Sequence, residues 1–130
     1  MRIPKHLLHI LSIVKHEDIA VKLLDAEHIG EGSYRAAYRI GQWVFKKHSR
    51  MRYGTYSYEQ RRNKIAALGV RIAPTMIING WEIQPYLKPL TAKQCVGFYN
   101  QIREAMNYAD INAYTNCGVD RWGRICVYDF

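Results

Sequence analysis

The chain lacks a long apolar run. Its most apolar N-terminal stretch, residues 7–14, is interrupted by His9 and Ser12, and it is far shorter than the ~20 apolar residues that a membrane-spanning helix needs. No signal peptide is recognisable either. These absences argue against a membrane protein, and we expect a soluble one.

Cysteine is also scarce, with three residues in 130. The three thiols form no Cys-x-x-Cys pair and have no histidine at metal-ligand spacing, so no zinc site is indicated. An odd number of cysteines is typical of a reduced, cytoplasmic protein. Cys117 and Cys126 could face each other across a hairpin, or they could be small half-buried strand residues.

Acidic residues are fewer than basic ones: the chain has 11 Asp and Glu and 19 Lys and Arg. The formal charge of +8 favours polyanionic or acidic partners, which include nucleic acid, ATP and acidic protein surfaces. At 130 residues and 48% hydrophobic composition, the chain can bury one core. We therefore expect a single compact domain over residues 1–130.

Apolar periodicity predicts an α+β fold. Helical spacing and capping residues such as Thr91 predict four helices, and alternation around tight turns predicts hairpins. The dipeptide Asn79-Gly80 is the strongest hairpin signal in the chain. The expected helices cover 4–15, 17–25, 57–68 and 92–108; the expected strands lie at 34–45, 75–79, 81–87 and on both sides of 120–123, with a basic loop over 46–54.

A glycine-rich segment opens the first strand region. Gly30 and Gly32 let backbone N–H groups approach phosphates, because glycine has no side chain to block them. Lys46 follows at the end of the next strand. Further along come Glu59 on a predicted helix, the segment 84–87 after the Asn-Gly hairpin, and finally Asn116 and Asp129 beside the last hairpin.

This order of residues resembles the protein-kinase-like superfamily, including its small-molecule kinase branches, from about residue 28 onward. The resemblance implies that Gly30 and Gly32 cover the phosphates of ATP. It also implies that Lys46 grips the α- and β-phosphates and that Glu59 pairs with Lys46 to hold it in place.

The resemblance assigns roles to the later residues as well. Gln84 and Tyr86 would belong to the hinge that meets adenine through its backbone. Asn116 and Asp129 would hold Mg²⁺, which prefers oxygen ligands. Asp110 would be the catalytic base, although it stands six positions before Asn116 where the family places its aspartate five before.

Two further departures mark this chain. Arg35 stands where the family has a third glycine, and the sequence stops after Asp129 and Phe130 without the following glycine, activation segment or helical substrate lobe. We therefore expect a truncated fold: a helical extension over 1–27, a kinase-like N-terminal lobe over 28–90, and a C-lobe remnant over 91–130. A phage or other mobile element would suit such a compact version.

Three functions follow from these patterns. The first is a minimal kinase-like domain that binds Mg·ATP and transfers phosphate with the help of a protein partner. The second is a catalytically inactive pseudokinase-like module that modulates a partner protein. A homodimer or a tight complex would cover the apolar surface that the missing helical lobe leaves exposed. The third is nucleic-acid binding by basic residues interleaved with tyrosines, for which the alternative is a solvated helix face with packing tyrosines: Arg50, Arg52, Tyr53, Tyr56, Tyr58, Arg61, Arg62 and Lys64.

Overall fold

A computed structural model gives the fold and describes residues 2–31, 36–48, 55–109, 111, 116–128 and 130. The fold is α+β, as expected, with helices and small antiparallel sheets. The chain contacts divide it into two compact units. The first unit comprises Met1–Ser49 and Pro74–Tyr86, and the second comprises Arg50–Ala73 and Leu87–Phe130.

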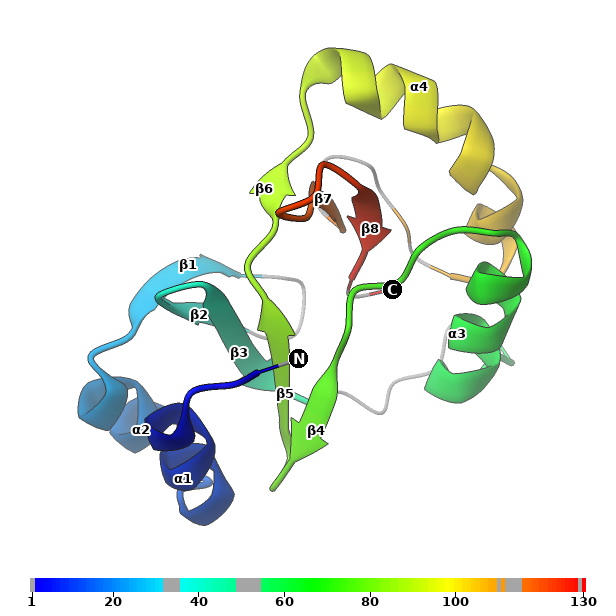
Figure 1. The fold of residues 1–130 in the computed structure, drawn as a ribbon. Coiled ribbons are helices and arrows are strands. Elements are labelled where there is room, and N and C mark those ends of the chain that lie inside the picture. Colours follow the sequence, from blue (N-terminus) through cyan, green and yellow to red (C-terminus); the bar gives the residue numbers. More distant parts are fainter. Residues whose placement is uncertain (1, 32–35, 49–54, 110, 112–115, 129) are drawn as a thin grey trace. The chain divides into compact units, whose positions relative to one another are not determined.

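The first unit is a five-stranded antiparallel sheet with two helices (Figure 1). The strand order is β1-β2-β3-β5-β4. Positive φ angles at Asn79 and Gly80 form the tight turn between β4 and β5, as the Asn-Gly dipeptide predicts. The elements are α1 (Lys5–Ile13), α2 (Glu17–Leu24), β1 (Glu27–Glu31), β2 (Ala36–Ile40), β3 (Trp43–Lys47), β4 (Met76–Ile78) and β5 (Trp81–Pro85).

One face of this sheet is apolar and packs against α1 and α2. An aromatic row crosses it, with ring centroids 5.5 Å apart between Tyr38 and Phe45 and 5.6 Å apart between Phe45 and Trp81. Leu7 and Leu11 of α1 join the same buried cluster. Directly opposite residues of paired strands share a face. The strand residues that alternate with this aromatic row therefore point to the other face of the sheet.

The end of α1 is tied to the β4–β5 turn. The Asn79 side chain donates to the carbonyl of Leu11 at 2.9 Å, and Trp81 Nε1 donates to the carbonyl of Val14 at 2.8 Å. Lys47 Nζ donates to the carbonyl of Lys15. The last carbonyls of a helix have no partner inside it, so these bonds stabilise the helix end and fix it on the sheet.

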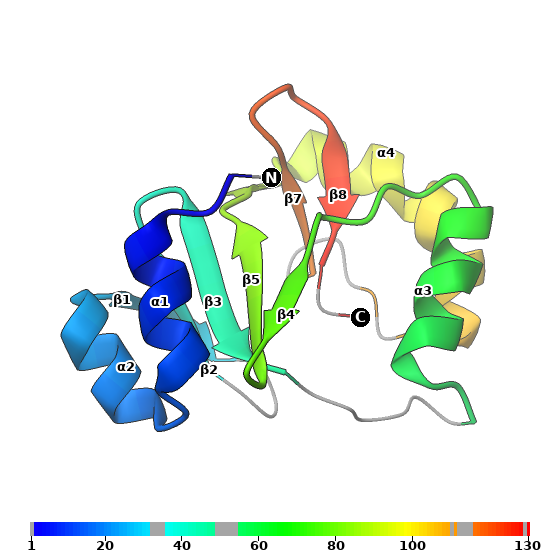
Figure 2. The same ribbon diagram turned by 60° about the horizontal axis from the view of Figure 1, so that its bottom comes forward.

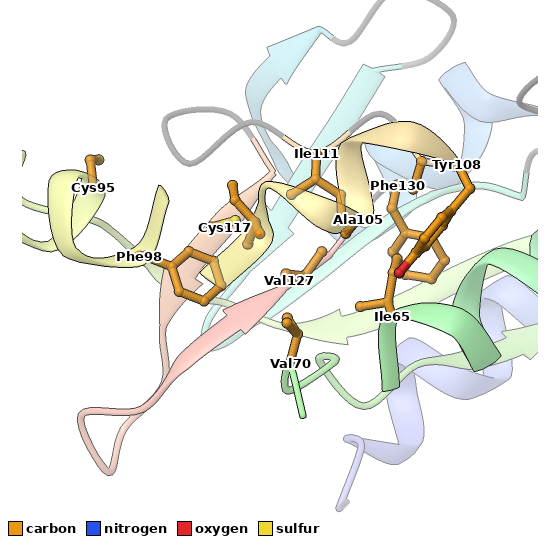
Figure 3. Packing of buried hydrophobic residues seen from close by; sticks show 12 residues of the cluster. Ile65, Val70, Cys95, Phe98, Ala105, Tyr108, Ile111, Cys117, Val127 and Phe130 are labelled. Carbon is orange, nitrogen blue, oxygen red and sulfur yellow. The ribbon is translucent and has the colours of Figure 1, made fainter. Parts of the chain in front are cut away.

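The second unit has its own buried core, shown in Figure 3. Ile65, Phe98 and Val127 come from three different elements and lie within this one apolar cluster. Side-chain caps start both α-helices, because Ser57 and Thr91 accept the backbone N–H of Gln60 and Gln94. The elements are α3 (Tyr58–Ala67), β6 (Lys88–Pro89), α4 (Ala92–Ile102), η1 (Glu104–Asn107), β7 (Cys117–Val119) and β8 (Ile125–Val127). Figure 2 labels α3, α4, β7 and β8 in a second view.

The second sheet pairs β6 with β7 and β7 with β8. Gly118 sits opposite Pro89 in this sheet. A Cβ at position 118 would lie 2.5 Å from Leu87 Cβ and 3.0 Å from the Lys88 carbonyl oxygen. Only glycine therefore permits this approach of the two strands.

The structure confirms the predicted helices and hairpins and corrects several details. β3 continues through Lys47, where a loop was expected from residue 46, and the segment 92–108 is α4 followed by the short 3₁₀ helix η1. Cys117 pairs with Val127, and Gly118 with Cys126. Adjacent strand residues point to opposite faces, so the two thiols do not face each other, and all three cysteines are free and buried.

Candidate functional site

The second face of the five-stranded sheet carries a row of small and charged residues. Register aligns Gly30 of β1 with Ala37 of β2, Ala37 with Lys46 of β3, and Lys46 with Glu82 of β5. Directly opposite residues of antiparallel strands share a face. The four positions therefore form one continuous row across the sheet, opposite to the aromatic face.

The two charged members of this row are buried. Lys46 is 3% exposed and Glu82 is 2% exposed. Taking a lone charge out of water is costly unless an opposite charge and hydrogen bonds compensate it. The register places Glu82 at the position directly opposite Lys46, and the Glu82 carboxylate forms an ion pair with His48 at 2.9 Å.

His48 and Gln84 extend the polar face. The carboxylate Oε1 of Glu82 lies 2.9 Å from His48 Nδ1, and His48 is two residues beyond Lys46. Gln84 is 5% exposed, and its Nε2 donates to Thr75 Oγ1 at 2.8 Å. These side chains make this face of the sheet polar and hydrogen-bonded, although Glu82 and Gln84 are buried.

The residues of the row on the β1 side of Lys46 are small. Gly30 has no side chain and Ala37 has a single methyl group. Among the described residues, a Cβ built on Gly30 would meet nothing within 4 Å. In the sheet, Lys46 therefore lies between the carboxylate-bearing position of Glu82 on one side and a strip of small residues, Ala37 and Gly30, on the other.

Lys47 provides a contrast, because it points to the opposite face. Its Nζ lies 3.9 Å from the Trp81 ring centroid. Burial lowers the pKa of Lys47, the nearby Glu17 carboxylate raises it, and Lys15 lowers it further; the net shift is downward. Lys47 thus serves the packing of α1 against the sheet, and Lys46 alone of the two belongs to the polar face.

The predicted site residues fall into three groups. Gly30, Lys46, Gln84 and Tyr86 lie in the first unit, and the first three share the polar face. Glu59 and Asn116 lie in the second unit. The predictions for Gly32, Asp110 and Asp129 fall outside the residues that the structure describes.

Glu59, the predicted partner of Lys46, is exposed near the start of α3. Lys46 belongs to the first unit and Glu59 to the second. The carboxylate that the register places opposite Lys46 is Glu82.

The backbone at Tyr86 already has a partner. The Tyr86 N–H donates to the carbonyl of Gln42 at 2.7 Å, and the guanidinium of Arg39 stacks on the Tyr86 ring at 3.6 Å. An adenine ring could accept a hydrogen bond from the Tyr86 N–H only by displacing the Gln42 carbonyl. Tyr86 is therefore better described as an anchor for the end of β5.

Asn116 lies at the open end of the β7–β8 hairpin. Its carbonyl accepts the Tyr128 N–H at 2.8 Å, which continues the ladder one position beyond Cys117 and Val127. Among the described residues, no three His, Cys, Asp or Glu side chains gather as a metal-binding group.

The basic and aromatic cluster at 50–64 is largely used for packing where it is described. Tyr58 stacks on Phe130 with centroids 5.2 Å apart, and Tyr56 meets Tyr108 edge-on at 5.9 Å. Arg61 is buried. This arrangement fits the packing alternative and leaves these tyrosines poorly placed to stack on bases.

Sequence reasoning missed Ala37, His48, Thr75 and Glu82. A partial signal existed, because the polar Glu82 and Gln84 alternate with the apolar Trp81 and Ile83, which is typical of a strand with one polar face. The partner of Glu82 was not readable, since β3 and β5 are far apart in the sequence.

Comparison with known proteins gives no match to a protein-family model, to a curated protein or to a solved structure. In the part of the chain that the structure describes, no helix is long and apolar enough to cross a membrane.

Proposed function

We propose that this chain is a minimal kinase-like protein that binds Mg·ATP on the polar face of its first sheet. The observation that carries the proposal is the row Gly30, Ala37, Lys46 and Glu82, in which a buried lysine lies beside two small residues. The sequence order that resembles protein kinases supports the same reading.

The chemistry of the row suits a phosphate group. The Lys46 ammonium offers three donors and a full positive charge, and in a buried setting its attraction to an anion is stronger than in water. Gly30 and Ala37 add little side-chain volume beside it. The strands fix these positions, so little ordering is needed when the ligand binds.

Glu82 has a defined part in this proposal. A lysine side chain has four rotatable bonds and needs a partner to hold it in one orientation. Glu82 stands directly opposite and is itself bonded to His48. We assign to Glu82 the positioning role that the kinase resemblance gave to Glu59.

The kinase resemblance assigns Mg²⁺ to Asn116 and Asp129, which belong to the second unit of the chain. An amide oxygen and a carboxylate match the oxygen preference of Mg²⁺. When bound, Mg²⁺ would neutralise phosphate charge. Transfer to an acceptor would further require a base, for which Asp110 remains the predicted residue.

A second function, an interaction module without catalysis, is favoured by one observation. The outer side of α4 and η1 leaves large apolar side chains in water: Val96 is 72% exposed, Tyr99 49% and Met106 41%. Exposed apolar groups at helical spacing are typical of partner-binding surfaces. This second function is compatible with nucleotide binding by the first unit.

Thermal melting with and without Mg·ATP tests the proposal. A ligand that binds only the folded state stabilises it by mass action, about 2.7 kcal/mol at 100 times Kd. We expect wild type to show a clear rise in Tm and Lys46→Ala to show none. Lys22→Ala, an exposed lysine of the same unit, is the matched control and should keep the rise. An equal response in all three proteins contradicts the proposal.

A further inference from the structure

The turn of the β7–β8 hairpin carries a tryptophan that is left in water. Trp122 is 64% exposed, whereas Trp81 is fully buried. The guanidinium carbons of Arg121 and Arg124 lie 4.1 and 4.7 Å from the Trp122 ring centroid. These are cation–π contacts, so the turn presents a stack of one indole and two guanidinium planes.

Asp120 holds this stack in a fixed shape. Its Oδ1 accepts the backbone N–H groups of Trp122 and Arg124, both at 2.9 Å, and its Oδ2 accepts Arg124 Nε at 2.8 Å. Burial would raise the pKa of Asp120, but the hydrogen bonds from Arg124 and Trp122 outweigh it and lower the pKa. The carboxylate is thus ionised and used within the turn.

The charge of the chain is concentrated in the unit that bears this turn. The second unit contains eleven Lys and Arg and five Asp and Glu, which is +6 of the total +8. Arg71 is exposed, and its neighbour Ile72 bridges to Val127 of β8. A turn that combines an indole with two arginines, in a unit of net positive charge, matches a ligand that is negative and carries flat rings.

We infer that the Arg121–Trp122–Arg124 turn binds single-stranded nucleic acid. Trp122 or the guanidinium planes stack on unpaired bases, and the arginine N–H groups contact phosphates. A duplex fits less well, because its bases are already stacked on each other. An acidic protein surface would satisfy the charges but would not use the planar stack.

This assignment differs in place from the tyrosine-rich segment 50–64, whose described tyrosines pack in the core. It is also independent of nucleotide binding by the first unit. Lys46 takes no part in it, so a result that contradicts one proposal does not contradict the other.

The experiment measures the anisotropy of a fluorescently labelled single-stranded oligonucleotide of about 12 residues as the full chain is titrated. Trp122→Ala should weaken binding by about 5- to 150-fold, the range measured for loss of one base–aromatic stack. Arg121→Gln should weaken binding and reduce the slope of log K against log salt by about one. Lys93→Gln, an exposed lysine on α4, removes the same charge elsewhere and should change binding little.

Three results would overturn the inference. If Trp122→Ala binds the oligonucleotide as tightly as wild type and keeps the same melting temperature, Trp122 does not stack on bases. Polyphosphate that competes as well as the oligonucleotide reduces the effect to charge alone. Poly-glutamate that binds with the same dependence on Trp122 assigns the turn to acidic proteins instead.

Discussion

Lys46 and Glu82 occupy directly opposite positions on the neighbouring antiparallel strands β3 and β5, and both are buried. Cross-strand partners have Cβ atoms roughly 5 Å apart on one face. The lysine expected from sequence to bind phosphate thus has an oppositely charged neighbour that the sheet itself supplies. Several consequences of this pairing and of the surrounding fold can be measured.

Glu82→Gln should lower the free energy of unfolding by about 3–5 kcal/mol, because it removes the buried carboxylate that pairs with His48 and stands opposite Lys46 in the sheet. Glu59→Gln, at an exposed position of α3, should change it by less than about 0.5 kcal/mol. Urea unfolding followed by circular dichroism measures both. If Glu59→Gln is the more destabilising substitution, Glu82 is not the partner of Lys46.

The same two variants separate the roles of the carboxylates in nucleotide binding. Where wild type binds Mg·ATP, Glu82→Gln should weaken binding by at least tenfold, since Lys46 loses its orienting partner, and Glu59→Gln should leave it unchanged. The reverse order would restore the assignment of Glu59 that the kinase resemblance implies.

Filling the strip beside Lys46 should block the ligand without unfolding the protein. Because an added Cβ at Gly30 meets no described atom within 4 Å, Gly30→Ala and Gly30→Val should keep the wild-type Tm within a few degrees, and valine favours strands. Affinity for Mg·ATP should fall from glycine to alanine to valine. A large loss of Tm in Gly30→Ala would show that the space is not open.

Gly118→Ala should destabilise the second unit by about 1–3 kcal/mol, the usual cost of overpacking, since its Cβ would lie 2.5 Å from Leu87 Cβ. Gly97→Ala is the matched control: it lies in α4 with open space around it, and alanine there should stabilise by up to about 1 kcal/mol. Equal effects of the two substitutions would contradict the packing of β6 on β7.

Stability should fall in alkali because of the buried thiols. Burial raises the pKa of Cys117 from 9.0 to about 12 and that of Cys126 to about 11. The unfolded thiols lose their protons first, so the unfolded state gains stability as pH rises above 9, by about 1.4 kcal/mol per pH unit for each thiol. Urea unfolding at pH 8, 9 and 10 should show this decline. The free energy of unfolding of Cys117→Ala should decline less steeply with pH than that of wild type. An identical slope in the two proteins would contradict the burial of the Cys117 thiol.

Local signals in the sequence predicted local structure well. Asn79-Gly80 formed its turn, Thr91 capped α4, and the hairpin around residues 120–123 formed as expected, because each depends on neighbouring residues alone. The strand β6 was missed, since two residues that include a proline carry no periodicity. The α+β class followed from the same patterns.

The candidate site was less readable because it depends on strand register. Lys46 and Gly30 were identified from sequence, but the row that joins them to Ala37 and Glu82 arises from pairing between strands distant in the chain. Register is set by which face of each strand is buried, and a single sequence does not say which strands are neighbours.

Titration calorimetry of Mg·ATP into the full chain tests the central claim most directly. We expect wild type and Lys22→Met to release the same binding heat with the same Kd, and Lys46→Met, which keeps the length of the side chain and removes its charge, to bind at least tenfold more weakly. Binding that is absent in wild type, or equally tight in Lys46→Met, would contradict nucleotide recognition by the polar face.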